Sequence, residues 1–536
     1  MAIKVHSIFN EILGPITTGP SSSHTAGCGR IGLTARSLWG KEIRKAEVVF
    51  EVRGSYPSTY IGQGSDYGFA GGLLGIPIDD SRFKDSLRIA KEQGVDISFK
   101  TANLGYDHPN QAEIRIYEDP QDSKPALRLM TFSIGGGMIE IRSMDDFHVY
   151  IDGSCKEAFI LCSEEQEDAV EEVIRQNQYF YDRTDRKGER FFEVDVHADQ
   201  DSAPLLALRE WEGVRYVRVA DPVMAVPRRR KAQMPFLNAA QAQAYGEEHG
   251  LNAAQLACIY EGSYGYAEEA DVYELAARTE EVMRSSSIPP DPKTTQVNGF
   301  LPYFGKEMAE NALQTDLPGG YGLRKAMLAS VAVMENSNAH NVVAAAPTAG
   351  ASGVLPGAIV ALGSCHGFSS QQILEGLLAA GLVGAFIGNQ ATFGAEVAGC
   401  QAENGAASAM AAAGLAHMMG CSLKGVFAAA SMALQNSLGL VCDPVAGLTE
   451  LPCISRNVAA MANAVTSANM AKLGFDPMIP LDEVIRAMLD VGQQLPAELR
   501  CTCKGGICAT PTGMRLQTWM DGMRESERKN DLGNAK

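Results

Sequence analysis

Short apolar runs alternate with small helical segments in the first part of the chain. From Ile43 to about Ile139, β-branched and aromatic runs (AEVVFEVRG, AEIRIYE and LRLMTFSIGGG) are separated by segments such as Lys84 to Gln93. Strands that are buried on one face typically show this period-two pattern, bounded by turn residues. The pattern predicts a mixed α/β domain over residues 1–150.

Residues 151–226 carry a second set of strands and helices. The runs EAFILC, FFEVDVHAD and VRYVRVADPV predict strands, and the stretch from Glu164 to Gln176 and the segment PLLALREWEG predict helices between them. This βαβ-like order is typical of an ACT-like regulatory module. The alternative is that these residues extend the first α/β domain. The usual glycine-containing turn after the first strand is missing, which weakens the case for amino-acid binding here.

The pattern changes after a linker at 227–240. Ala, Gly, Leu and Met at helical spacing dominate from about Gln241 to Met488, and segments such as SAMAAAGLAHMMG are apolar on nearly every side. Such helices are interior helices that pack closely through small residues. We therefore predict a mostly helical domain over 241–523, followed by a charged tail at 524–536. The expected fold class is multi-domain α+β.

Charge and composition exclude several classes of partner. The chain has 46 basic and 64 acidic residues, a formal charge of -18, which repels nucleic-acid phosphates and anionic membranes. The basic run Arg228 to Lys231 predicts a solvated linker, with a nucleic-acid patch as the alternative. The N-terminus lacks the features of a secretory signal, so we expect a cytoplasmic protein. Twelve cysteines in such a chain indicate metal binding, catalysis or burial rather than disulfides.

Three cysteines stand in unusually small-residue surroundings. Cys400, Cys442 and Cys453 lie in GAEVAGCQAENG, GLVCDPVAGL and LPCISRN. Three thiolates without a fourth in similar surroundings are what a four-iron cluster with one exchangeable iron requires. An iron with an open position is a Lewis acid, which favours a lyase that removes a hydroxyl group from a small substrate. For each cysteine taken singly, an ordinary core thiol is the alternative.

A hydroxyl-rich turn lies near the N-terminus. The segment GPSSSHTAG, residues 19–27, surrounds His24 with hydroxyl groups between glycines. Hydroxyls and free backbone amides in such a turn form a donor surface suited to a small carboxylate or phosphate. The alternative is a helix N-cap. The candidate binding residues in this turn are Ser21, Ser22, Ser23 and Thr25.

Two further segments combine hydroxyls with glycines. GSYPSTYIGQGSDYGFAGGLLG, residues 54–75, contains Ser55 and permits close backbone approach. The segment from Glu335 to Gly357 contains Thr348 and Gly350 at a Gly/Pro turn, which turn chemistry alone could explain. Taken singly, neither segment specifies a reaction.

Together these motifs resemble the iron-sulfur-dependent L-serine dehydratases in a form with fused β and α parts. GPSSSHTAG, GSYPSTY, HPN at 108–110 and SIGGG at 133–137 look like the β-part signatures. APTAG, GAEVAGCQ, CDPVAG and PCISRN look like those of the α part. They occur in the family's order over almost the whole chain, except for the ACT-like stretch and the tail.

The resemblance implies the cofactor, the reaction and the site. Cys400, Cys442 and Cys453 would each bind one iron of a [4Fe-4S] cluster, and the Ser21 to Thr25 segment would hold the substrate carboxylate beside it. His24 would be the base or an orienting hydrogen-bond donor. The reaction would convert L-serine to pyruvate and ammonium. The alternatives are β-elimination on L-cysteine or L-threonine, or a non-catalytic amino-acid sensor that holds a structural metal. Further candidate substrate-binding residues are Ser55, Thr348 and Gly350.

The sequence departs from the family pattern at several cysteines. Cys28 stands where the family more often has proline, and it is either a buried small residue or an extra reactive thiol. In ELRCTCKGGICATPTG, any one of three cysteines could cap the open iron until substrate displaces it, and a second metal site is a weaker alternative. These are Cys501, Cys503 and Cys508. We also expect a homodimer, because the small-residue helices and a site between domains favour one.

Overall fold

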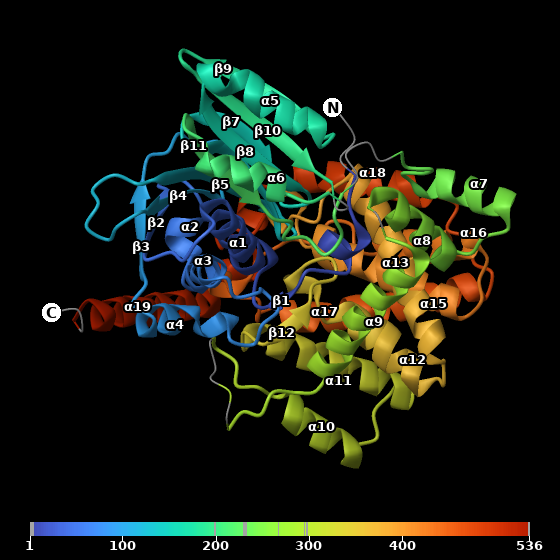
Figure 1. Cartoon of the computed structure of the whole chain (residues 1–536). Helices are drawn as coiled ribbons and strands as arrows, with labels where there is room; N and C mark the ends of the chain where they lie inside the picture. The colour runs from blue at the N-terminus through green and yellow to red at the C-terminus, as the bar shows by residue number, and fades with distance from the viewer. Residues whose placement is uncertain are drawn as a thin grey trace. The chain divides into compact units, whose positions relative to one another are not determined.

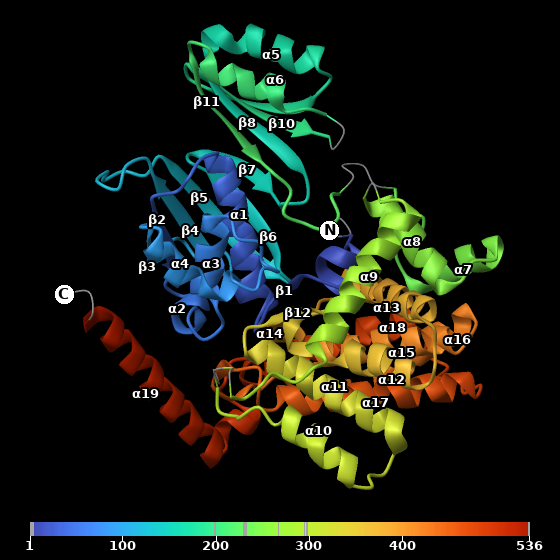
Figure 2. The ribbon, with the colours of Figure 1, turned by 60° about the horizontal axis from the view of Figure 1, so that its bottom comes forward.

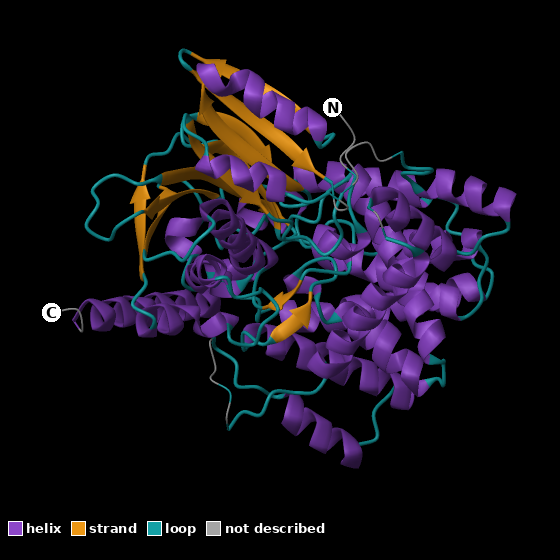
Figure 3. Cartoon of the chain, in the orientation of Figure 1, coloured by secondary structure: helices purple, strands orange, loops and turns teal. Residues whose placement is uncertain are grey.

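The computed structural model describes residues 5–197, 200–228, 233–265, 267–293, 295 and 299–533. The chain forms two compact units. Unit 2 is Ser23–Arg228, and unit 1 combines Met1–Ser22 with Arg229–Lys536. Unit 2 contains the two larger sheets, whereas unit 1 is predominantly helical (Figures 1 and 3). The predicted multi-domain fold of helices and strands with a helical C-terminal region is confirmed, and the finer domain boundaries stay a prediction.

The first sheet of unit 2 has six strands in the order β3-β2-β4-β5-β6-β7. β2 and β3 are parallel, and all other neighbours are antiparallel. The three runs predicted as strands are β2, β4 and β5, and their alternate side chains fill the core beneath α1. The strands are β2 (Lys45–Glu51), β3 (Asp96–Ala102), β4 (Gln111–Tyr117), β5 (Leu127–Gly135), β6 (Met138–Met144) and β7 (Phe147–Ile151). The helices are α1 (Gly27–Trp39), α2 (Tyr56–Thr59), α3 (Ser65–Leu74) and α4 (Ser86–Glu92).

Helices α1 and α3 lie side by side (Figure 2), and glycines set their separation. A Cβ atom at Gly72 would lie 2.2 Å from the Gly29 carbonyl oxygen, so no larger residue fits there. A Cβ at Gly68 would lie 2.8 Å from the Thr25 carbonyl oxygen. The glycine-rich segment at 54–75 therefore holds α3 against the turn that carries His24.

The second sheet of unit 2 has four antiparallel strands in the order β11-β8-β10-β9. The elements are β8 (Lys156–Ser163), α5 (Glu167–Gln176), β9 (Phe180–Arg186), β10 (Glu189–Val196), α6 (Ala203–Leu206) and β11 (Val214–Ala220). This is a βαββαβ arrangement of the ferredoxin-like kind, with a core of its own between the sheet and α5. The regulatory role of an ACT-like module stays a prediction. Strand β9 is absent from the sequence-based prediction.

Small residues bring the central helices of unit 1 into close contact. A Cβ at Gly414 of α15 would lie 2.5 Å from the Gly376 carbonyl oxygen of α13. α13 is the one helix in the described ranges that is long and apolar enough to span a membrane, but 78% of its apolar window is buried, as in a core helix. The longer helices are α7 (Ala239–His249), α8 (Ala253–Tyr264), α9 (Glu269–Ser286), α10 (Gly305–Gln314), α11 (Gly320–Asn338), α13 (Ser370–Gln390), α15 (Ala406–Met418), α16 (Leu423–Gln435), α17 (Cys453–Lys472), α18 (Leu481–Gln494) and α19 (Pro511–Gly533). Two short helices complete the set, α12 (Leu362–Cys365) and α14 (Ala395–Ala398).

The N-terminal segment belongs to the helical unit. A buried π-helical turn, Ile8–Ile12, begins where the Ile8 N–H donates to the carboxylate of Glu261 in α8 at 2.7 Å. Strand β1 (Ile16–Thr18) then pairs antiparallel with β12 (Val342–Ala344). These contacts bring the start of the hydroxyl-rich turn to the APTAG loop.

The predicted basic linker is only partly described. Arg228 forms an ion pair with Asp152 at 3.0 Å. Arg229, Arg230 and Lys231 lie outside the described residues, so the choice between a linker and a nucleic-acid patch stays open.

Candidate active site

The three predicted cysteine ligands lie in one region of unit 1. Cys400 and Cys442 are buried and pack in the same small apolar cluster, and Cys453 is the first residue of α17. Burial raises the pKa of the Cys400 thiol to about 11. Burial also raises the pKa of Cys453 well above its usual range, and the nearby charge of Cys400 raises it further. The folded chain therefore keeps these thiols protonated unless a cation binds them.

Of the three C-terminal cysteines, Cys501 is the one that joins this region. The Cys501 N–H donates to the Cys442 carbonyl at 2.8 Å. A hydrogen bond between the two side chains is the largest cause that raises the pKa of Cys442. Cys503 and Cys508 instead hydrogen-bond the Pro444 carbonyl, at 3.3 and 3.2 Å.

Two polar side chains reach the cysteine region from the helices. The Asn404 amide donates to Cys400 Sγ at 3.0 Å, which lowers the pKa of that thiol against the effect of burial. Arg456, one turn into α17, pairs with Asp443 at 2.7 Å. Asp443 also accepts the Ile507 N–H at 2.7 Å and so holds the C-terminal loop.

The donor types in this region, cysteine thiols with an amide hydrogen bond to one sulfur, are those that an iron-sulfur cluster uses. Cluster ligands are thiolates that bind separate corner irons, and hydrogen bonds to their sulfurs tune the cluster. Over the described ranges, no three His, Cys, Asp or Glu side chains converge closely enough to hold one ion. That finding also argues against a zinc ion held by Cys501, Cys503 and Cys508.

Glu403 connects the APTAG turn to the cysteine region. The Thr348 hydroxyl donates to Glu403 Oε1 at 2.9 Å, and a Cβ at Gly350 would lie 3.3 Å from the same oxygen. Burial raises the pKa of Glu403 to about 7, although the Thr348 hydroxyl lowers it. Asn457 fixes the turn to α17 by donating to the carbonyls of Gly350 and Cys453, at 2.8 and 2.9 Å.

The hydroxyl-rich turn contributes Ser22 to this side of the site. The Ala349 N–H donates to Ser22 Oγ at 3.1 Å, and Ser21 is half-buried just before it. Within unit 1, the structure thus brings together Ser22, Thr348 and Gly350, and Glu403 links this turn to the cysteines.

The other predicted residues of the turn lie in unit 2, around His24. Its Nε2 atom is 3.3 Å from Ser55 Oγ, and its Nδ1 atom is 3.5 Å from Ser23 Oγ. The ring packs edge-on against Tyr56, with centroids 5.4 Å apart. Burial lowers the pKa of His24 to about 4, so the imidazole is neutral at pH 7.

A hydrogen-bond chain fixes the surroundings of His24. Ser55 donates to Asn110 Oδ1, and the Asn110 amide donates to the Ser133 carbonyl at 3.3 Å. Ser133 then donates to the Ser23 carbonyl at 2.8 Å. Thr25 donates to the Gln63 carbonyl at 2.9 Å. Ser23, Thr25 and Ser55 are therefore held in place by partners inside unit 2.

Cys28 lies one turn after His24 and is a buried thiol. Its Sγ lies 3.3 Å from the Tyr56 hydroxyl, and burial raises its pKa to about 12. A thiol held neutral in this way is unreactive. This favours the interpretation of Cys28 as a small buried residue.

Several polar residues of the site were not singled out from the sequence. Asn110 and Ser133 stand in motifs that were noted only for their resemblance, and Glu403 follows Cys400 by three residues. The sequence feature that could have identified these residues is a charged or amide side chain within a stretch of small residues, as in CQAENG. The full set is Asn110, Ser133, Glu403, Asn404, Asp443, Arg456 and Asn457.

Comparison with known proteins extends over most of the chain. The family model for the serine dehydratase alpha chain matches residues 163–508. The probable L-serine dehydratase alpha chain of Bacillus subtilis (strain 168) is 44% identical over 188 residues, covering 35% of this chain and 63% of that one. The L-serine dehydratase alpha chain of Peptoniphilus asaccharolyticus is 40% identical over 214 residues, covering 40% of this chain and 73% of that one.

A separate relative matches the beta part. The probable L-serine dehydratase beta chain of Bacillus subtilis (strain 168) is 43% identical over 152 residues, covering 28% of this chain and 66% of that one. Alignments with an alpha chain and a beta chain from one organism agree with the fused arrangement expected from the motifs.

Proposed function

The chain belongs to the serine dehydratase family, and we propose that it is an L-serine ammonia-lyase that forms pyruvate and ammonium with a [4Fe-4S] cluster. The observation that carries this proposal is the cysteine region. Cys400, Cys442 and Cys453 come together there, and Glu403 links them to the Thr348 and Gly350 turn.

Elimination from serine requires help at both ends of the substrate. The α-proton is weakly acidic and hydroxide is a poor leaving group, so charge must be stabilised at both atoms. A cluster with one iron free of protein ligands would supply a Lewis acid for the β-hydroxyl. The remaining tasks fall to side chains: binding the carboxylate, orienting the substrate and accepting the α-proton.

The carboxylate is assigned to the Ser21 and Ser22 hydroxyls and the backbone of the turn at Thr348, whose own hydroxyl proton is donated to Glu403. Hydroxyl groups and backbone N–H groups of turns bind anions without adding a charge of their own. Glu403 restricts this turn by accepting the Thr348 hydroxyl at 2.9 Å. A carboxylate substrate next to Glu403 adds negative charge, which raises the pKa of Glu403 further above its value of about 7. Glu403 is then protonated when the substrate binds, and repulsion is avoided.

His24 is assigned as the proton acceptor. Covalent geometry keeps it close to the turn, because its Cα lies within about 7.6 Å of the Ser22 Cα, two residues earlier. The imidazole is neutral at pH 7, which is the form that accepts a proton. An anionic substrate beside it raises its pKa from about 4 and so strengthens the base.

Cys501 is assigned as the displaceable ligand among the C-terminal cysteines. It is exposed, and its backbone and side chain both contact Cys442. The thiols of Cys503 and Cys508 instead donate hydrogen bonds to the Pro444 carbonyl. The twelve cysteines, all of them free thiols, also support a reducing, cytoplasmic location.

Anaerobic iron reconstitution followed by a pyruvate or 2-oxobutyrate assay tests the proposal. L-serine, D-serine, L-threonine and L-cysteine are compared side by side, with iron and sulfide measured per chain. We expect brown protein with about four irons and preference for L-serine. Preference for L-cysteine or L-threonine would mean that the substrate assignment is wrong while the site assignment still holds. Brown protein that is inactive on all four amino acids would favour the sensor alternative. Colourless protein with full activity would show that the reaction does not use a cluster.

A further inference from the structure

A cavity of about 320 Å³ lies in unit 1, among α10, α11 and α17. Both α10 and α17 pack against α11 (Figure 2). Met327 and Val331, one turn apart on α11, form one wall, and Ile454 and Val458, one turn apart on α17, form another. The loop at 301–304 and the start of α10 complete the lining. Cavities of this size with mainly apolar walls are the usual sites of small ligands.

Two buried carboxylates lie in the wall of this cavity. Glu335 is on α11, one turn after Val331, and Glu450 lies three residues before α17. Each side chain belongs to a residue that is only 3% exposed. Burial raises the pKa of Glu335 to about 7 and also raises the pKa of Glu450. Among the described residues that line the cavity there is no lysine or arginine to offset these charges.

Backbone N–H groups near the start of α10 are the partners of both carboxylates. Glu335 accepts the Phe304 N–H at 2.6 Å and the Gly305 N–H at 2.9 and 3.1 Å. Glu450 accepts the N–H groups at 300–301, at 2.7 and 3.3 Å. A carboxylate has about four lone-pair positions, and these contacts use three at Glu335 and two at Glu450. Both side chains can therefore accept a further hydrogen bond from a donor in the cavity.

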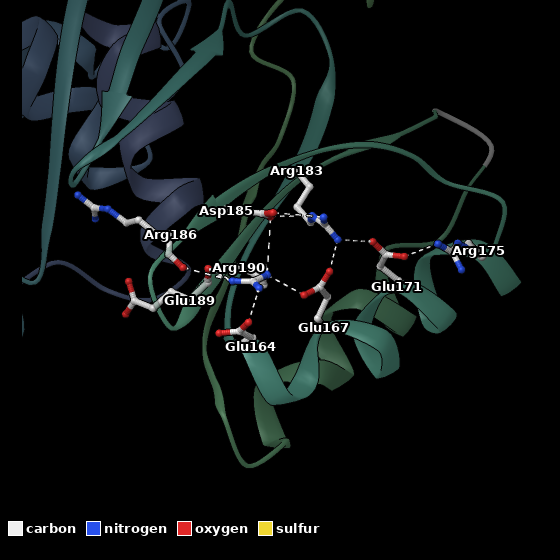
Figure 4. A network of polar contacts seen from close by, with 9 residues as sticks. All are labelled: Glu164, Glu167, Glu171, Arg175, Arg183, Asp185, Arg186, Glu189 and Arg190. Atoms are coloured by element: carbon white, nitrogen blue, oxygen red, sulfur yellow. Dashed lines mark hydrogen bonds and ion pairs between the residues drawn. The ribbon is translucent and has the colours of Figure 1, made fainter.

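A charged cluster in unit 2 shows the usual arrangement of carboxylates for comparison. Glu167 contacts Arg183 and pairs with Arg190 at 2.6 Å (Figure 4). Over the described ranges, the groups that lower the pKa of Glu335 and of Glu450 include no cation. Buried charges are normally paired or bind a metal. Because no three metal-ligating side chains converge in the described part of the chain, a cationic organic ligand fits better than a metal ion.

The walls and the carboxylates together define the chemistry of such a ligand. The apolar walls fit a hydrocarbon or aromatic body, and Met308 and Met327 are flexible enough to adapt to its shape. An ammonium group carries the positive charge that the carboxylates lack and donates up to three hydrogen bonds. A ligand carboxylate would be repelled by the two glutamates. L-serine, which is small and polar and has a carboxylate, therefore does not match this cavity.

We propose that this cavity binds a small amine with an apolar body, whose ammonium group contacts Glu335 and Glu450. The cavity is separate from the candidate active site, because it contains none of the residues assigned to that site. The two share only α17, in which Cys453 is the first residue whereas Ile454 and Val458 line the cavity. The proposal does not rest on the enzymatic function.

Isothermal titration calorimetry on the full, anaerobically reconstituted chain tests the class of ligand. The compounds 2-phenylethylamine, 2-phenylethanol and 3-phenylpropanoate share a phenyl ring and differ in their polar end. The amine should bind about ten- to a hundredfold more tightly than the alcohol, because hydrogen bonds between charged groups are stronger than those of neutral groups. 3-Phenylpropanoate should show no binding. An excess of L-serine should not displace the amine, because the cavity is separate from the candidate active site.

Variants of the carboxylates test the position of the site. Glu450→Gln removes the charge but keeps an oxygen that can accept the loop N–H groups, and Glu335→Gln does the same on α11. Each change should weaken amine binding about tenfold and leave alcohol binding unchanged. The double variant should bind the amine no more tightly than the alcohol.

Two further variants separate the cavity from general effects of charge. Val458→Phe places a larger side chain in the wall and should weaken binding of both the amine and the alcohol. Glu307→Gln removes a negative charge from an exposed position on α10 that does not line the cavity, and it should change no affinity. Circular dichroism and thermal unfolding of every variant check that the fold is kept.

Several outcomes would overturn the proposal. They are an amine that does not bind at millimolar concentration, an amine that binds no more tightly than the alcohol, and an affinity that is unchanged in the double variant. Displacement by L-serine would mean that the cavity is part of the active site. If the double variant did not fold, the comparison of the three compounds on the wild type and the effect of Val458→Phe would still decide the question.

Discussion

The His24 cluster of unit 2 and the cysteine region of unit 1 are both buried, yet burial has opposite consequences in them. Around His24 it lowers the pKa to about 4 and favours the neutral imidazole, which is the form a base needs. Around the cysteines it raises the pKa and favours the neutral thiol, which is the form a metal ligand does not use. The His24 cluster is therefore complete when the chain folds, whereas the cysteine region needs a bound cationic group. The predictions below test this difference.

The largest effect is expected from Cys400→Ala. Loss of one thiol from a set of three should release the metal, and pyruvate formation from L-serine should fall to background. Iron content and visible absorbance, measured on anaerobically reconstituted protein, give a readout that does not depend on activity. Cys258→Ala is the matched control, because Cys258 is a buried thiol of α8 in the same unit. A Cys400→Ala protein with full iron and full activity would show that the ligand assignment is wrong.

His24→Ala should affect catalysis without affecting metal binding. The protein should keep its iron, because His24 is not among the candidate metal ligands, while kcat falls by about 10²- to 10⁴-fold. His417→Ala removes another imidazole whose pKa burial lowers and serves as the control. Iron loss in His24→Ala would mean that metal binding depends on the His24 cluster, and unchanged kcat would mean that the base is another group.

A smaller effect is expected from Thr348→Val. The change removes the hydroxyl that donates to Glu403 at 2.9 Å and leaves the size of the side chain almost unchanged. Leaving the buried Glu403 carboxyl without this hydrogen-bond partner costs about 1–3 kcal/mol, so KM should rise by roughly ten- to a hundredfold with iron content unchanged. Thr466→Val, whose hydroxyl bonds only the carbonyl of Ala462 in its own helix, should leave KM unchanged.

The sequence predicted the strands that follow simple alternation and missed the one that does not. β2, β4 and β5 are buried on at least one face, so their apolar periodicity is strong. β9 is exposed and charged, and only its pairing with β10 makes it a strand. The place of the N-terminal segment in unit 1 depends on the contact between Ile8 and Glu261, about half the chain away. Local patterns carry no information on such a contact.

In the candidate site too, some residues could be predicted from local sequence patterns and others could not. The cysteines and His24 stand in recognisable motifs, so residue type and spacing were enough to select them. Glu403 gains its position from Thr348, and Asn110 gains its position from Ser55, each 55 residues away. Their importance arises from burial and partner, which only the folded chain defines. Cys501 was not distinguished from Cys503 and Cys508 for the same reason.

The smallest expected effect is the contribution of His24 to the dependence of stability on pH. The pKa of His24 is about 4 in the folded chain, below its usual value of 6.5. Between these values the imidazole binds a proton in the unfolded chain but not in the folded chain, so the His24 contribution to stability falls as pH drops below 6.5 and stops falling near pH 4. At pH 5 the loss from His24 relative to pH 7.5 is about 2 kcal/mol. Urea midpoints of metal-free protein at the two pH values, compared with those of His24→Gln, isolate this contribution because glutamine does not titrate. The cysteines add nothing to this window, since their raised pKa values keep them protonated throughout it. Asp66 and Glu403, whose pKa values burial raises to about 7, contribute in the opposite direction in the wild type and in His24→Gln alike, so the difference between the two proteins reports His24. If His24→Gln kept the full pH dependence of the wild type, the imidazole would not be held neutral by burial, and the contrast between the His24 cluster and the cysteine region would not hold.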